Sequence, residues 1–316
     1  MATTFRKVAV VGAGAVGSFY GAMLARAGHA VVLIGRPAHV AAIRRDGLRL
    51  EMAGRTETVA VEASSEVAAA RGAELVLVSV KSTDTDAVAR ELAPLLGRDA
   101  VVVSLQNGVD NADVIAQRVD ATVVPAVVYV ATAMPAPGVV RHHGRGDLVI
   151  GPRTRDGGAD AVLGERLDAL VAFFATAGVA VKVSPDVVAE LWSKLLVNCA
   201  YNAISALAQA SYGEMVELAP IRELQRAVVA EVVAVAAASG VELPLAAAID
   251  AMARIAPAMP AQLSSTAQDL ARRKPSEIDH LNGFVARRGR ELGIATPANQ
   301  ALFALVKLVE SRHARA

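Results

Sequence analysis

The strongest constraint on the fold lies near the start of the chain, where residues 7–34 read KVAVVGAGAVGSFYGAMLARAGHAVVLI. The apolar run Val8–Val11 leads into a glycine-rich turn, a helical pattern follows, and a second apolar run spans Ala30–Ile34. A strand, a glycine turn, a helix and a second strand in this order form the βαβ unit that binds dinucleotides. Glycines let the backbone approach a pyrophosphate, and the free N–H groups of the helix start attract its charge. The predicted dinucleotide site comprises Gly12, Ala13, Gly14, Ala15, Val16 and Gly17. The alternative is a plain glycine turn between a strand and a helix.

The residue after the second strand bears on which dinucleotide is bound. Units that bind NAD usually place Asp or Glu there, to hold the adenosine ribose hydroxyls. Here the chain reads LIGRP, with Gly35 and Arg36 in that place, and the next carboxylate is Asp46. A guanidinium can pair with the 2′-phosphate of NADP(H) through charge-assisted hydrogen bonds. We therefore predict NADP(H) as the cofactor, against the alternative that Arg36 is an ordinary surface arginine.

Two more apolar runs end in polar residues. AELVLVSV (73–80) precedes Lys81, and AVVVSLQ (100–106) precedes Asn107 and Gly108. Because ligands lie outside the carboxyl ends of parallel strands, Lys81 and Asn107 are expected near the nicotinamide half of the cofactor. The alternatives are a surface lysine and a tight turn that favours asparagine and glycine. Further strands are expected at 122–130, 148–150 and 180–187.

The pattern changes near residue 184. From Pro185 onward the apolar period is that of a helix, with no clear alternating strand. Helices are expected near 185–208, 214–239, 244–256, 260–272, 275–293 and from 297. The predicted fold is an α/β Rossmann-type N-terminal domain with a parallel sheet (1–183, NADP-binding), followed by an all-α C-terminal domain (184–316, substrate-binding and catalytic).

Composition excludes several classes of function. Hydrophobic residues make up 54% of the 316 residues, the net charge is +1, and aromatic residues reach only 3%, so nothing indicates a nucleic-acid partner. Prolines or polar residues interrupt the two longest uncharged runs, which argues against a membrane partner. The histidines lack metal-ligand spacing, and the single cysteine, Cys199, fits a cytoplasmic location. The strongly apolar segments 227–238 and 301–309 fit either core or the face of a homodimer.

One helical segment carries an unusual polar row. LWSKLLVNCAYN (191–202) places Lys194, Asn198 and Asn202 four residues apart, and therefore on one face of a helix. Amides buried without partners cost about 1–3 kcal/mol each, so the row should face a ligand, a cleft or water. The spacing alone leaves open that it is simply a solvent-exposed face.

Six ordered blocks carry a resemblance that covers nearly the whole chain. They are GAGAVGS, VKSTDTD, LQNGVDN, LWSKLLVNCAYN, SSTAQDLARRKPSEIDHLNG and GIATPANQ. Together they are similar to the ketopantoate reductases (2-dehydropantoate 2-reductases), which act in pantothenate biosynthesis. The resemblance implies reduction of a small-molecule 2-oxo acid to a 2-hydroxy acid by NADPH.

The same resemblance implies roles for individual residues. Lys194 matches the general acid, and Glu277 in SEID matches its acidic partner. Polar positions around the substrate match Lys81, Asn107, Asn198, Asn202 and Ser265. The cofactor site matches the three glycines of the turn, Arg36, Lys81 and Asn107. The role of Arg141, His142 and His143 stays open.

Two other classes of protein share part of this pattern. A β-hydroxyacid dehydrogenase also combines a Rossmann domain, a helical domain and a K-x-x-x-N motif. Its lysine typically follows a glycine-rich helix start, whereas Lys194 follows PDVVAELWS, which has no glycine. The second alternative is a protein that senses NADP(H) without catalysing a reaction. The presence of Lys194 and Glu277, which match catalytic positions of the family, argues against it.

Overall fold

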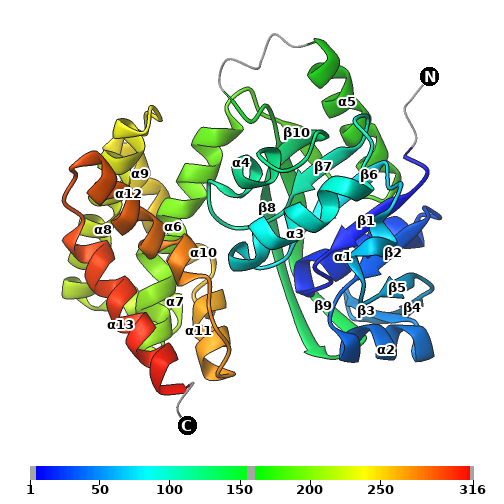
Figure 1. Cartoon of the computed structure of the whole chain (residues 1–316). Coiled ribbons are helices and arrows are strands. Elements are labelled where there is room, and N and C mark those ends of the chain that lie inside the picture. Colours follow the sequence, from blue (N-terminus) through cyan, green and yellow to red (C-terminus); the bar gives the residue numbers. More distant parts are fainter. Residues whose placement is uncertain (1–4, 155–160, 314–316) are drawn as a thin grey trace. The chain divides into compact units, whose positions relative to one another are not determined.

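A computed structural model describes residues 5–154 and 161–313 of the chain. It divides into two compact units, an N-terminal unit, Met1–Val188, and a C-terminal unit, Ala189–Ala316. The first contains the sheet and the second is helical (Figure 1).

The N-terminal unit is built on one sheet, which has ten strands among the described residues. The strands are β1 Val8–Val11, β2 Val31–Ile34, β3 Leu48–Met52, β4 Arg55–Val59, β5 Glu62–Ser64, β6 Leu75–Val78, β7 Val101–Ser104, β8 Thr122–Ala136, β9 Val139–Ile150 and β10 Val181–Val183. Their order is β4-β3-β9-β8-β7-β6-β1-β2-β5, with β10 paired to β9. The run from β8 through β1 to β5 is parallel throughout, which confirms the Rossmann-type prediction.

Both faces of the central strands are buried. In β1, Val8 and Val10 belong to one apolar cluster, and Ala9 and Val11 to another on the opposite face. Helices α1 (Ala15–Arg26), α2 (Pro37–Asp46) and α5 (Ala161–Thr176) contribute to the first cluster. Helices α3 (Thr85–Leu92) and α4 (Asn111–Ala116) contribute to the second. Strands buried on both faces read as continuous apolar runs, which is why the sequence revealed them.

The sheet is mostly parallel, and two antiparallel hairpins extend it. Strands β8 and β9 pair antiparallel, and both are much longer than predicted from 122–130 and 148–150. The outer part of this hairpin is only partly buried, so it lacks the apolar run of a central strand. The second hairpin, β3–β4, was missed; a two-residue loop joins it, with Ala53 at φ 50° and Gly54 at φ 73°. Positive φ at both loop residues matches the twist of antiparallel strands.

The C-terminal unit consists of helices. They are α6 Val187–Ala208, α7 Tyr212–Glu217, α8 Ala219–Ala238, α9 Leu245–Ala253, α10 Ile255–Ala258, α11 Ser265–Ala271, η5 Ile278–His280, α12 Asn282–Leu292 and α13 Pro297–His313. The predicted helices at 185–208 and from 297 correspond to α6 and α13. None of the helices in the described part of the chain is both long enough and apolar enough to cross a membrane.

Several predicted helices are broken or shorter. The segment 214–239 divides at Leu218, which is extended (φ −89°, ψ 120°), because Pro220 lies in the first turn of α8 and favours a helix start there. The segment 275–293 divides at Leu281 into η5 and α12, and 244–256 forms α9 and α10. Helix α11 begins only at Ser265, because the Ser264 side chain accepts the Ala267 N–H as a cap. In the segment 227–238, Val228, Val229, Val232 and Val235 are fully buried, so this face of α8 belongs to the core.

Candidate functional site

The glycine turn after β1 needs two of its glycines for packing. Gly12 has φ +100°, and a Cβ on it would lie 2.4 Å from the Val80 nitrogen. A Cβ on Gly17 would lie 2.3 Å from Ser79 Oγ and 2.5 Å from the Gly12 oxygen. Ser79 Oγ donates to that same oxygen at 2.8 Å. The loop after β6 therefore presses directly against the turn, and larger residues would force them apart.

Gly14 has no such reason to be glycine. Its φ is −81°, and a Cβ on it would meet only the Gly12 oxygen within 4 Å, at 3.9 Å. It is exposed and precedes α1, a 12-residue helix whose start no side chain caps. The first-turn N–H groups of such a helix remain available to an anion. An exposed glycine with open space above it, at a helix start, fits the close approach of a pyrophosphate.

The end of β2 is held against this turn. The backbone N–H groups of Gly12 and Ala13 both donate to the Ile34 oxygen, at 2.9 and 2.8 Å. A Cβ on Gly35 would lie 2.9 Å from the Ala13 Cβ. Arg36 follows, exposed, at the N-cap position of α2. Its guanidinium is thus carried on the segment next to the glycine turn, where a ribose 2′-phosphate would require a cation.

A buried histidine fixes the helix that begins after Arg36. His39 lies on α2, and its Nδ1 accepts the Gly138 N–H at 2.8 Å. An amide can only donate, so Nδ1 carries no proton, the ring is neutral, and Nε2–H faces Ser18 Oγ at 3.1 Å. Burial lowers the pKa of His39, which agrees with a neutral ring. His39 thereby ties α2 to α1 and to the turn between β8 and β9.

Lys81 and Asn107 lie on the loops after the adjacent strands β6 and β7. Both are half-buried, and both follow their strands, as predicted. The Asn107 carbonyl accepts Ser82 Oγ at 3.0 Å and Asn111 Nδ2 at 2.6 Å. Asn111 Nδ2 also lies 3.1 Å from Ser82 Oγ. The residue after Lys81 is therefore bonded to the Asn107 backbone, so the structure brings these two loops together.

The rest of this network was not foreseen from the sequence. Gln106 Nε2 donates to Thr85 Oγ1 at 2.6 Å and to the Val80 carbonyl at 3.1 Å. Ser104 Oγ donates to Gln106 Oε1 at 3.1 Å. Gln106 is only 5% exposed, and buried amides stay in place when fully bonded. The signal was present, since polar residues directly follow a fully buried strand in SLQNG, but a simple turn explained it equally well.

The polar row of the C-terminal unit lies on α6, as predicted. Lys194 and Asn198 are half-buried, and Asn202 is 4% exposed. Asn202 Nδ2 lies 3.5 Å from Ser265 Oγ, a long hydrogen bond, so two predicted substrate residues from different helices are neighbours. Ser264 holds them there: its Oγ donates to the Asn202 carbonyl at 3.1 Å, and its N–H donates to Ser205 Oγ at 3.2 Å.

Glu277 lies directly before the short helix η5 and is half-buried. Five residues later, Asn282 donates from Nδ2 to the Cys199 carbonyl on α6 at 3.1 Å. The segment that carries Glu277 is thus attached to the helix that carries Lys194. The role assigned to each of these two side chains remains a prediction.

The three residues of open role lie on β9. Arg141 pairs with Glu51 through its Nε, at 2.6 Å. The His142 ring stacks on the Phe19 ring of α1, with centroids 4.6 Å apart, and His143 is exposed. For Arg141 and His142 these contacts hold the hairpin to β3 and α1.

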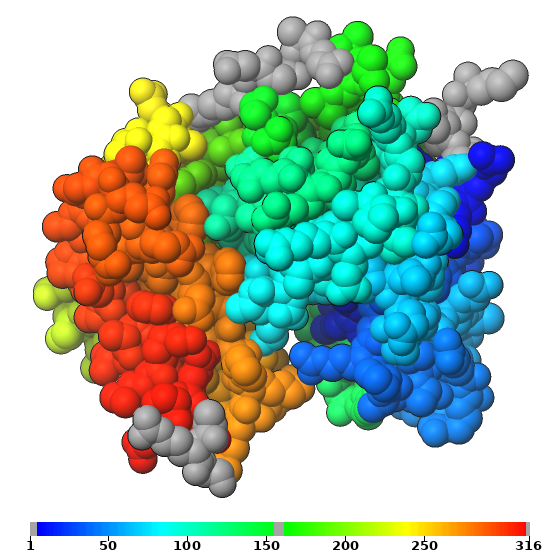
Figure 2. All heavy atoms as spheres, viewed as in Figure 1, coloured from blue at the N-terminus to red at the C-terminus, as the bar shows by residue number. Residues whose placement is uncertain are grey.

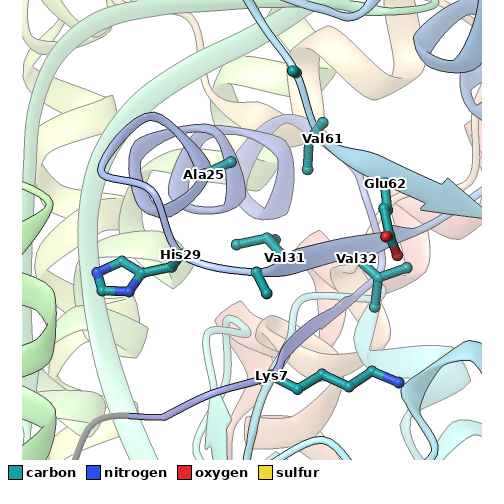
Figure 3. Close-up of a pocket in the computed structure, with 9 residues that line it drawn as sticks. Lys7, Ala25, His29, Val31, Val32, Val61 and Glu62 are labelled. Carbon is teal, nitrogen blue, oxygen red and sulfur yellow. The ribbon is translucent and has the colours of Figure 1, made fainter.

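A separate pocket lies at the opposite ends of the strands. Lys7, His29, Val31 and Glu62 line it (Figure 3). Lys7 and His29 precede β1 and β2, and Val31 and Glu62 begin β2 and β5, so the pocket belongs to the amino ends of parallel strands. The glycine turn follows the carboxyl end of β1, where such sheets bind dinucleotides. The pocket is therefore distinct from the candidate cofactor site.

A parallel sheet with this glycine turn, followed by a helical unit with a lysine–asparagine row, defines a nicotinamide-dependent oxidoreductase. Residues 8–155 match the family described as Ketopantoate reductase PanE/ApbA, and residues 186–310 match Ketopantoate reductase PanE/ApbA C terminal. The chain belongs to the ketopantoate reductase family, whose members use NADPH.

Relatives match over their full length. The 2-dehydropantoate 2-reductase of Halobacterium salinarum is 36% identical over 310 residues, covering 96% of this chain and 99% of that protein. The crystal structure of a PanE/ApbA family ketopantoate reductase from Ralstonia eutropha JMP134 is 54% identical, with a TM-score of 0.89, covering 98% and 99%. D-mandelate dehydrogenase, solved with NADH and anilino(oxo)acetate, is 25% identical, with a TM-score of 0.90 and the same coverage.

Proposed function

We propose that this protein reduces the ketone of a 2-oxo acid to a 2-hydroxy acid with NADPH, and that its substrate is 2-dehydropantoate (ketopantoate). The observation that carries the proposal is the row on α6. One helix face presents a cation and two amides, Lys194, Asn198 and Asn202, with Asn202 beside Ser265. Membership of the ketopantoate reductase family supplies the substrate class.

The reaction requires a proton donor at the carbonyl oxygen of the substrate. NADPH, when bound, supplies a hydride to the carbonyl carbon. In the proposal the Lys194 ammonium hydrogen-bonds the carbonyl oxygen, stabilises its growing negative charge and then donates the proton that completes the hydroxyl group. Glu277 orients the ammonium and keeps it protonated before transfer. Lys194 regains its proton from water.

The remaining residues hold the two ligands. Asn198, Asn202 and Ser265 offer donors and acceptors for the hydroxyl and carboxylate groups of the substrate. On the N-terminal unit, the exposed helix start after Gly14 receives the pyrophosphate, and Arg36 receives the 2′-phosphate. Lys81 and Asn107 serve the nicotinamide half of the cofactor and the substrate.

Absorbance of NADPH tests the proposal directly. Purified protein is mixed with NADPH and one of three acids: 2-dehydropantoate, a short aliphatic 2-oxo acid, or the aromatic phenylglyoxylate. The aromatic acid is included because the similar D-mandelate dehydrogenase was solved with anilino(oxo)acetate, which carries an aromatic ring. Oxidation with 2-dehydropantoate at the highest kcat/KM is expected. Turnover with phenylglyoxylate alone would keep the reductase class and replace the substrate, and no oxidation with any acid would refute the class.

We also propose that the protein forms a homodimer through α13. Leu305 and Leu308 on this helix are 48% and 57% exposed, although they belong to the apolar segment 301–309. Helix α13 reaches the surface along much of its length (red in Figure 2). Light scattering after size exclusion should give twice the 32.6 kDa chain mass, and Leu308→Glu should halve it. A monomer in the unaltered protein would refute the dimer.

A further inference from the structure

Three side chains donate hydrogen bonds to main-chain carbonyls in the middle of α6. Asn282 Nδ2 donates to the Cys199 oxygen at 3.1 Å, and Gln225 Nε2 donates to the Ala200 oxygen at 3.3 Å. Ser264 Oγ donates to the Asn202 oxygen at 3.1 Å. The three donors come from α12, α8 and the N-cap of α11. We call this set the α6 clamp.

These bonds are unusual for a helix interior. A carbonyl there already accepts the N–H of the residue four positions on, so the clamp uses its second lone pair. Asn282 and Gln225 are fully buried. The Asn282 Oδ1 atom finds no hydrogen-bond partner among the described residues. A buried amide with an unsatisfied oxygen lowers stability relative to a well-packed apolar side chain. Packing alone therefore does not account for an asparagine at position 282.

The position of the clamp indicates what that role is. Two of the accepting carbonyls, those of residues 199 and 200, lie between the two asparagines of the polar row, and the third is that of Asn202 itself. Apolar contacts tolerate small rotations of a helix, whereas hydrogen bonds to its backbone fix rotation and translation together. Three such bonds from three helices set the direction in which Asn198 and Asn202 point.

Asn282 has a second connection. Its Nδ2 also donates to Asn299 Oδ1 at 3.0 Å, and Asn299 is held by Glu231, which accepts its side-chain Nδ2 at 2.8 Å and its backbone N–H at 2.9 Å. The Glu231 carboxylate thus caps the start of α13. It also orients the Asn299 side-chain amide, which in turn orients Asn282. Asn282 follows Glu277 by five residues, so the same side chain links the Glu277 segment to α6.

We propose that Asn282 and Gln225 are positioning residues for the reaction. They hold the polar row of α6 and the segment that carries Glu277 in the positions that the reaction requires. This inference rests on the proposed reductase function. Neither side chain needs to touch the substrate. Their contribution is to keep the polar row from rotating or sliding, because a misplacement of about 1 Å can lower turnover a hundredfold.

The test compares Asn282→Ala with Val306→Ala, a matched control. Val306 is a fully buried residue of α13 without a polar side chain, so its truncation destabilises the unit without removing a clamp bond. Both variants are assayed well below their melting temperatures, for kcat and KM with the best 2-oxo acid and for NADPH affinity. Asn282→Ala should lower kcat about ten- to a hundredfold, with NADPH affinity unchanged. Val306→Ala should lower the melting temperature similarly and leave kcat within about threefold.

Amide hydrogen exchange supplies a readout that needs no activity. A peptide covering 198–206 should exchange faster in Asn282→Ala than in Val306→Ala, because only the first loosens α6. Equal exchange in this peptide, or an equal loss of kcat in both variants, would overturn the proposal. If the unaltered protein reduces no 2-oxo acid, the proposed function fails, while the exchange comparison still decides whether the clamp holds α6.

Discussion

Replacement of Gly14 by alanine separates cofactor binding from folding. A Cβ at this position meets only the Gly12 oxygen, at 3.9 Å, and the φ of −81° is open to any L-residue. The protein itself therefore leaves room for a methyl group. The room lies above the uncharged, uncapped start of α1, where the pyrophosphate is proposed to bind.

The expected change in stability is small because two effects oppose each other. Replacing glycine by alanine reduces the entropy of the unfolded chain, which stabilises by about 0.4–1 kcal/mol. Alanine is a poorer N-cap residue than glycine, which destabilises by about 0.5–1 kcal/mol. The net change in the free energy of unfolding should stay within about 1 kcal/mol.

The expected change in affinity is large by comparison. A methyl group at this point keeps a phosphate from reaching the backbone N–H groups, and a hydrogen bond to a charged group contributes about 1.5–3 kcal/mol. That corresponds to an NADPH Kd raised about ten- to a hundredfold. Calorimetric titration with NADPH measures the affinity, and thermal melting without NADPH measures the stability.

Gly12→Ala provides the contrast. Its φ of +100° and the 2.4 Å approach to Val80 predict a loss of about 2–5 kcal/mol of stability, from backbone strain and overpacking. If Gly14→Ala bound NADPH normally, the pyrophosphate would not lie against this helix start. If Gly14→Ala unfolded as readily as Gly12→Ala, the packing argument would fail as well.

Three further predictions concern single side chains. Lys194→Ala should lower kcat by about 10²–10⁴, the usual contribution of a general acid, with NADPH affinity nearly intact. Arg36→Ala should raise the Kd for NADPH about tenfold or more, through the lost 2′-phosphate contact, and change NADH binding little. His39 should make stability fall as pH drops below about 6.5, the pKa of an unfolded histidine. Its folded-state pKa is lowered by burial, so the unfolded state binds the extra proton, and protonation would set two N–H groups of His39 and Gly138 against each other.

Each of these has a clear contrary result. Near-normal turnover in Lys194→Ala would remove it as proton donor. Equal weakening of NADPH and NADH by Arg36→Ala would place the arginine outside the 2′-phosphate site. Urea unfolding at several pH values, compared between the unaltered protein and His39→Gln, measures the third effect. A slope of stability against pH that is the same in both proteins would show that His39 titrates freely.

Local patterns predicted much of the fold. The central strands of the N-terminal unit were found because they are buried on both faces and therefore read as unbroken apolar runs. The β8–β9 hairpin was underestimated because its outer part is half-exposed and rich in proline, glycine and histidine. Helix breaks at Leu218 and Leu281 were missed because an apolar period continues across them.

The residues of the candidate site also differ in whether the local sequence predicts them. The glycine turn, Arg36 and the α6 row were visible as motifs, because each lies within a short segment whose geometry follows from its own sequence. Ser265 and Glu277 came only from family resemblance, since nothing local distinguishes them from solvated helix residues.

The sequence by itself determined a dinucleotide-binding α/β half, a helical half and one helix face with a lysine and two asparagines. The tertiary structure decided which glycines serve packing and which leaves room for a ligand, because that depends on Ser79 and Val80, more than 60 positions from the turn. It also decided how α6 is held, through a bond between Asn282 and Cys199 that spans 83 residues. Periodicity reports the environment of a segment, whereas such bonds depend on which distant segments the fold brings together.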